Sequence, residues 1–173
     1  MTRRMQEIIF ECYRQGDPFV QGIREEEIPE LIDKFRHRLS QSAGKLDTSS
    51  NSLKNLHKTL IRYVQQTATD TRSFSEEENL QIVREITAYL GSVTVNNLGG
   101  HWYSSGNLLT AGVALEGRFE AVKGNEIRKL SKTIINLGYF AAGIWDCALK
   151  GIDVDIMQSY KRLTKKRIKE HLG

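Results

Sequence analysis

The segment 74–100 constrains the fold more than any other part of the sequence. Ser75 followed three residues later by Glu78 is typical of a capping box at the start of a helix. Apolar residues then recur at helical spacing, at Leu80, Val83, Ile86, Leu90 and Val93. Gly91 lies inside this pattern, where glycine costs about 1 kcal/mol relative to alanine, so we expect a close packing partner there. Asn96–Gly100 is a stop signal. The fold is therefore built around one long helix that ends at two glycines.

After this stop, short runs rich in aromatic and β-branched residues are separated by glycines. Such runs favour strands. We expect three of them, over residues 101–103, 108–115 and 118–122, in an antiparallel hairpin or meander.

Helical periodicity predicts the remaining elements. They are a helix over 25–42 with Pro29 near its start, a helix from Leu53 to Val64, a segment from Ile127 to Leu137, an apolar helix over 139–150, and a last helix that begins near Asp153. The helix over 139–150 is apolar nearly all round, so we expect it to be the central buried helix. The last helix holds an inward stripe of Ile156, Tyr160 and Leu163. The fold class is α+β, mostly helical, with a small three-stranded antiparallel sheet between N-terminal and C-terminal helices.

A chain of 173 residues predicts a single globular domain over 1–173. It divides into a helical N-terminal part (1–73), a part with the long helix, the sheet and buried helices (74–150), and a basic C-terminal helix (151–173). Its 39% apolar and 27% charged residues are ordinary for a globular protein, and a core of this size needs neither disulfide nor structural metal.

The positive charge is concentrated at the C-terminal end. Lysine and arginine total 25 against 21 acidic residues, a formal charge of +4. Residues 161–173 carry six cations against Glu170, a balance of +5, which leaves −1 for the rest. The six are Lys161, Arg162, Lys165, Lys166, Arg167 and Lys169. At helical spacing Lys161, Lys165 and Lys169 share one face, which could contact phosphates or a partner protein, or be a solvated face. No aromatic residue lies within this run, which argues against single-strand recognition.

Cys12 and Cys147 lie far apart in apolar contexts, which is typical of small buried hydrophobic residues in a reducing compartment. A redox pair or a nucleophile is the alternative. The N-terminal residues turn polar before any long apolar run, so no signal peptide is expected. The most apolar stretch, residues 137–149, is shorter than the roughly 20 residues of a membrane span. We therefore expect a cytoplasmic protein without membrane association.

Catalytic signatures are not assembled in the sequence. The four histidines are scattered, without the spacing of a zinc site, so we expect neither a metal nor another cofactor. Gly112–Gly117 has the glycine spacing of a phosphate loop, but Arg118 and Phe119 stand where lysine and a hydroxyl residue are needed. Asp153 and Asp155 are interpreted as helix caps.

One possible pocket lies at the start of the expected sheet, at His101, Trp102 and Tyr103. We expect an ordinary structural role for His101, and a ligand-binding or catalytic role is the alternative. The aromatic residues Trp102, Tyr103, Phe119, Tyr139 and Trp145 are interpreted mainly as core.

The motif Tyr89-Leu90-Gly91, with Asn97-Leu98-Gly99-Gly100-His101-Trp102 and the glycine-bounded strands after it, resembles a pattern in small bacterial α+β proteins without an assigned activity. The resemblance covers about residues 30–135. It implies a bacterial cytoplasmic protein, and the basic last helix has no counterpart in the pattern.

Together these features predict a non-enzymatic interaction protein, an accessory or inhibitor-type subunit that binds a partner protein through the sheet edge or the terminal helix. The alternatives are a nucleic-acid-binding accessory protein that acts through the basic C-terminal helix, and an enzyme with a site around His101. The oligomeric state stays open.

Overall fold

The computed structural model describes residues 4–40, 46–68, 73–103, 106–115, 121–123, 126–128 and 133–172. At 121–123, 126–128, 133 and 166–172 it describes the backbone alone. The helices are α1 (Met5–Arg14), α2 (Ile28–Arg38), α3 (Leu56–Thr67), α4 (Glu76–Leu98), α5 (Leu137–Leu149) and α6 (Ile156–Leu172). Short 3-10 turns are η1 (Pro18–Val20), η2 (Glu25–Glu27), η3 (Ser50–Asn55) and η4 (Leu108–Thr110). The strands are β1 (His101–Tyr103), β2 (Gly112–Leu115), β3 (Ala121–Lys123), β4 (Glu126–Arg128) and β5 (Thr133–Asn136).

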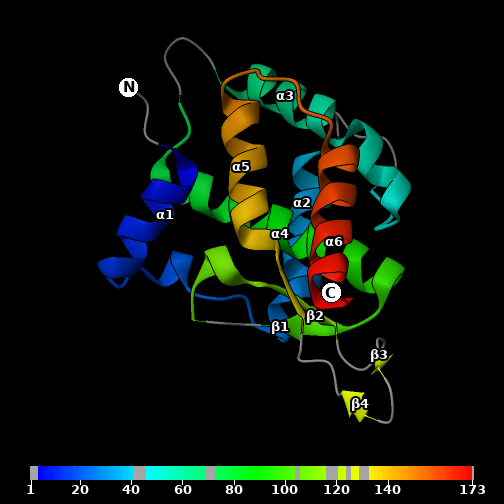
Figure 1. Cartoon of the computed structure of the whole chain (residues 1–173). Helices are drawn as coiled ribbons and strands as arrows, with labels where there is room; N and C mark the ends of the chain where they lie inside the picture. Colours follow the sequence, from blue (N-terminus) through cyan, green and yellow to red (C-terminus); the bar gives the residue numbers. More distant parts are fainter. Residues whose placement is uncertain are drawn as a thin grey trace.

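The protein is a mostly helical α+β structure with a three-stranded antiparallel sheet at one end of the helices (Figure 1), as the sequence predicts. One cluster of buried apolar residues draws on α1 to α6 and on the sheet. Among the described residues, none of the helices combines the length and the apolar content needed to cross a membrane.

Helix α4 is the central helix. Every residue from 82 to 91 is buried, and α4 packs against both α2 and α5 (Figure 1). The capping box is confirmed, since the Glu78 amide donates to the Ser75 hydroxyl at 3.1 Å and the Ser75 amide donates to the Glu78 carboxylate at 2.8 Å. The expectation that residues 139–150 form the central helix is wrong at its first turn, because Tyr139 is 60% exposed.

The predicted packing partner of Gly91 is Trp102. The indole ring lies so close to Gly91 that a β-carbon there would overlap it, and α4 runs unbroken through this position. The helix ends at Gly99, whose φ of +71° favours glycine. The next residue, Gly100, has φ +87° and lies against the Ala114 carbonyl of β2. Gly99 and Gly100 turn the chain from α4 into β1, and Trp102 of β1 packs back onto Gly91. We call this region the Gly91–Trp102 joint.

The sheet differs from the prediction in its third strand. Its order is β1-β2-β5, with Trp102 paired to Val113 and Val113 to Ile135. Residues 121–123 pair instead with β4 in a separate two-stranded sheet, and residues 118–120 lie outside the described part. The prediction of a helix from Ile127 to Leu137 is therefore wrong over residues 127–128 and 133–136, which form parts of β4 and β5. Apolar residues three or four apart cannot by themselves separate a short helix from short buried strands.

The strand expected over 108–115 is also shorter than predicted. Residues 108–110 form η4, because the Asn107 side chain accepts a hydrogen bond from the Leu109 amide at 2.8 Å and starts a turn. Of the expected strand, residues 112–115 form β2.

The first helix, α1, is an element that our sequence analysis does not predict. Its buried residues are Met5, Ile9 and Cys12, which follow one another at intervals of four and three. This spacing is itself a helical signal. Cys12 is buried, as expected, and both cysteines are free thiols. Helix α1 packs against α5 and η4, so it covers a side of the core that the other helices leave open.

The last helix begins at Ile156 and buries Ile156 and Tyr160, with Leu163 partly buried, which confirms the predicted inward stripe. Asp155 acts as a cap, since it accepts a hydrogen bond from the Gln158 amide at 2.9 Å. Asp153 has a different role, because its carboxylate pairs with Nε2 of His57 in α3. This contact fastens the α5–α6 connection to α3.

Candidate functional site

The three residues of the predicted pocket do not line a common cavity wall. They are consecutive in β1, so the Trp102 side chain points to the opposite face from those of His101 and Tyr103. Trp102 is occupied by its contact with Gly91, while His101 is exposed. The motif that marks this region is therefore accounted for by the packing of the joint.

The basic residues of α6 face outward where their side chains are described. Lys161, Arg162 and Lys165 are exposed, opposite the buried Ile156 and Tyr160. Lys166, Arg167 and Lys169 also belong to α6, but their side chains lie outside the described part.

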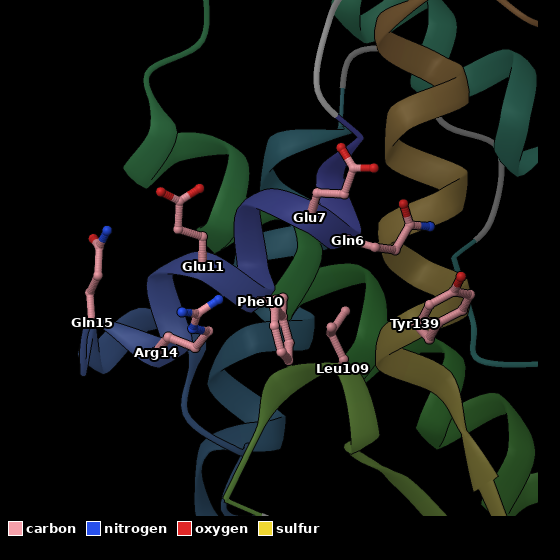
Figure 2. Close-up of a pocket in the computed structure, with 8 residues that line it drawn as sticks. All are labelled: Gln6, Glu7, Phe10, Glu11, Arg14, Gln15, Leu109 and Tyr139. Atoms are coloured by element: carbon pink, nitrogen blue, oxygen red, sulfur yellow. The ribbon is translucent and has the colours of Figure 1, made fainter.

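A groove of about 660 Å³ runs between α1, η4 and the start of α5, and we call it the α1–α5 groove (Figure 2). It is lined by Gln6, Glu7, Phe10, Glu11, Arg14, Gln15, Leu109 and Tyr139. Phe10 is 52% exposed and Tyr139 is 60% exposed, and Figure 2 shows Leu109 between them. The groove thus presents two large aromatic side chains to solvent beside an aliphatic one.

The local sequence explains why these side chains meet. Helix α1 buries Met5 and Ile9, which leaves Phe10 on its outer flank. At the start of α5, a β-carbon on Gly138 would overlap the Leu108 carbonyl, so glycine lets η4 sit directly on this helix. Tyr139 follows at once and points outward beside η4.

The charges at the groove come from α1. Glu7 and Glu11 lie one turn apart and both line it, and Arg14 lies over the Phe10 ring at 5.9 Å from its centroid. The cation holds one aromatic wall in place, while the two carboxylates make the rim beside it acidic.

A smaller apolar cavity of about 240 Å³ continues the groove and shares Gln6 and Tyr139 with it. Its other lining residues are Phe140, Gly143, Ile144, Cys147, Val154, Ile156 and Ser159. Burial raises the pKa of the Cys147 thiol, which disfavours its thiolate form, and the side chain forms part of the apolar wall. The cavity has the volume of roughly eight water molecules, enough for an apolar side chain.

A second groove, between α2, α3 and α4, has a polar floor. Arg38 donates to both carboxylate oxygens of the fully buried Glu85, at 2.7 and 2.8 Å, and to the Tyr63 hydroxyl at 3.0 Å. The hydrogen bonds to Glu85 raise the pKa of the Arg38 guanidinium. Gln81 also donates to Glu85. Because these groups form hydrogen bonds with one another, the network links α2, α3 and α4. Both carboxylate oxygens of Glu85 are already hydrogen-bonded within it.

One group of metal-ligating types occurs among the described residues. Ligand atoms of Cys12, Asp17 and Glu76 lie within 4.8 Å of one another. The Cys12 thiol donates to Glu76 at 3.3 Å, and Asp17 accepts from the Phe19 amide at 2.9 Å. These contacts join the end of α1 to the start of α4 and account for the cluster without a ligand.

The α1–α5 groove is not predicted from the sequence, for two reasons. Phe10 belongs to α1, which is not among the predicted helices, and the prediction for Tyr139 is a core position because its helix is apolar nearly all round. That second assignment is wrong, whereas Trp145 is fully buried as expected and Phe119 lies outside the described part. The spacing of Met5, Ile9 and Cys12 was the signal that could have placed Phe10 on a surface.

Comparison with protein-family models, with curated proteins and with solved structures finds no match for this chain.

Proposed function

We propose that the protein is a non-enzymatic cytoplasmic binding module of a bacterial cell that holds a partner protein in the α1–α5 groove, as an accessory or inhibitor-type subunit. The carrying observation is the pair Phe10 and Tyr139, both more than half exposed in one groove. Aromatic side chains left in water on a concave surface are typical of the anchor regions of protein interfaces.

The chemistry of the groove defines the partner. An apolar side chain of the partner fills the cavity beside Cys147, and its neighbours cover Phe10 and Tyr139. Because Glu7 and Glu11 line the same groove, basic residues flank that anchor. The occupant is therefore a segment with apolar anchors and a basic flank, of the kind that an amphipathic helix presents.

The groove explains partner binding better than the edges of the sheet do. Edge strands β1 and β5 have three and four residues, and β5 packs against α6. Strands this short leave few unpaired backbone groups for an added strand.

The test is affinity capture from the lysate of the source cell at about 0.1 M and about 0.5 M salt, with wild type and with the double variant Phe10→Ser/Tyr139→Ser. We expect one partner to be retained by wild type at both salt concentrations, because apolar contacts are not screened. The double variant should lose it.

Ile152→Ser is the matched control, since Ile152 is 48% exposed but does not line the groove or its cavity. Equal losses in the control and the double variant, or a partner that both retain, would contradict the proposal.

A further inference from the structure

Basic side chains in two parts of the molecule differ in their partners. Those of α2, those of α4 and Lys150, which directly follows α5, lie within 4 Å of a carboxylate. The pairs include Lys34–Glu30, Arg38–Glu85, Arg84–Glu27 and Lys150–Asp146. A second group in η3, α3 and α6 forms no ion pair with any residue that the structure describes. It consists of Lys54, Lys58, Arg62, Lys161, Arg162 and Lys165, all exposed.

Three of these cations form a stripe along η3 and α3. Lys54, Lys58 and Arg62 follow one another at intervals of four, and the whole segment from Ser50 to Thr67 contains no acidic residue. The interval of four places Lys58 and Arg62 one helical turn apart on the same side of α3, and Lys54 lies in η3 just before this helix. The charge balance along the chain suggests that the positive charge is confined to the C-terminal segment. The stripe on η3 and α3 shows that it is not.

The two basic elements are adjacent and fixed to each other. The turn η3 packs against α6 (Figure 1), and the pair between His57 and Asp153 ties α3 to the connection that leads into α6. Lys58 is the next residue after His57, and Lys161 lies in the second turn of α6. We call this combined set of six cations the α3/α6 basic surface.

We infer that the α3/α6 basic surface binds the sugar-phosphate backbone of double-stranded nucleic acid, independently of the α1–α5 groove. Cations that no carboxylate neutralises gain the most from phosphate contact, and each contact releases counterions. Two elements that are fixed to each other can contact phosphates without first being ordered.

Other polyanions fit this surface less well. The aromatic side chains of its two elements turn inward, since Tyr63 packs near Trp145 and Tyr160 is buried against Thr94, so neither can stack on an unpaired base. A bilayer surface requires an exposed apolar face, and that of α6 is buried at Ile156 and Tyr160. A protein partner requires apolar anchors among the charges, and these six exposed residues supply none.

The test is fluorescence anisotropy of the full chain with a labelled mixed-sequence duplex of about 20 base pairs, over a series of salt concentrations. The α3 variant is Lys54→Gln/Lys58→Gln/Arg62→Gln, and the α6 variant is Lys161→Gln/Arg162→Gln/Lys165→Gln. Each should weaken binding at least about tenfold near 0.1 M salt and make the slope of log affinity against log salt shallower by about 2 to 3.

The matched control is Lys34→Gln/Arg36→Gln/Lys150→Gln, which removes the same charge from exposed cations that already have carboxylate partners. Its slope should equal that of wild type. Circular dichroism and the unfolding temperature verify that each variant is folded.

Absence of salt-dependent binding by wild type would overturn the inference, as would equal weakening by the control or an α3 variant that binds like wild type. Competition by polyglutamate as effective as that by a duplex of equal charge would also overturn it, in favour of an acidic protein. The Phe10→Ser/Tyr139→Ser variant should bind the duplex like wild type, so failure of this inference is distinguishable from failure of the partner-binding proposal.

Discussion

The Gly91–Trp102 joint and the α1–α5 groove both contain aromatic side chains next to helices, but they use them in opposite ways. At the joint, the Trp102 ring lies on a glycine of the central helix. In the groove, Phe10 and Tyr139 leave more than half of their surface in water. The conspicuous sequence motif marks the joint, and no motif marks the groove.

This difference shows that a conspicuous motif can serve packing alone. Glycine is needed at position 91 because the Trp102 ring lies directly against the helix backbone there. It is favoured at positions 99 and 100 because φ is positive. A surface for a partner needs no such backbone requirement within this chain. Substitutions should therefore affect stability at the joint and partner binding at the groove.

Trp102→Ala should have the largest effect on stability. Removal of the ring leaves a cavity over Gly91, and we expect the free energy of unfolding to fall by about 3 kcal/mol. This value is at the low end of the range for tryptophan-to-alanine substitutions, because Trp102 is only partly buried. Urea denaturation followed by circular dichroism measures this. A change below about 1 kcal/mol would mean that the joint does not hold the sheet to α4.

Substitution of a glycine inside a helix should have opposite effects on stability at the joint and beside the groove. Gly91→Ala should lower the free energy of unfolding by about 1 kcal/mol, because the overlap with Trp102 outweighs the gain in helix propensity. Gly143→Ala should raise it by up to about 1 kcal/mol, since the added methyl group would meet only the flexible end of Gln6, at 3.2 Å. Thermal and urea unfolding of both variants measure the sign, and the same sign for both would contradict the comparison.

Removal of a tyrosine hydroxyl group should affect stability at a buried position and not at the exposed groove position. Tyr160→Phe removes a buried hydrogen bond to Thr94 of 2.9 Å and should cost about 1 kcal/mol, whereas Tyr139→Phe, on an exposed residue, should cost almost nothing.

Burial raises the pKa of Tyr160, so the unfolded chain ionises first as the pH rises. The stability from this group is complete below the unfolded pKa of about 10 and is lost as the pH rises through the folded pKa. Tyr160→Phe should therefore flatten the alkaline decline of the unfolding free energy relative to wild type and to Tyr139→Phe. Parallel alkaline profiles for all three proteins would be inconsistent with a buried hydroxyl.

Phe10→Ser should have only a small effect on stability. The residue is more than half exposed, so we expect a change within about 0.5 kcal/mol despite the lost contact with Arg14. Urea denaturation of the purified variant measures it. A loss as large as that of Trp102→Ala would show that Phe10 belongs to the core, and the groove would lose its main anchor.

The sequence by itself determined the elements whose signals are local. The capping box at Ser75, the glycine stop at Gly99 and the inward stripe of α6 depend on neighbours within a few residues, so spacing alone was sufficient. The packing requirement at Gly91 was also predictable, because a glycine inside a long helix needs a compensating contact.

Only the tertiary structure decided which elements meet. Strand β5 completes the sheet because Ile135 pairs with Val113 across more than 20 residues, and no local pattern specifies that partner. Exposure of Tyr139 depends on how α1 and η4 pack around the start of α5. The α3/α6 basic surface exists because two segments about 100 residues apart pack together. Burial and charge proximity are properties of long-range contacts, and periodicity along the chain reports only the short-range ones.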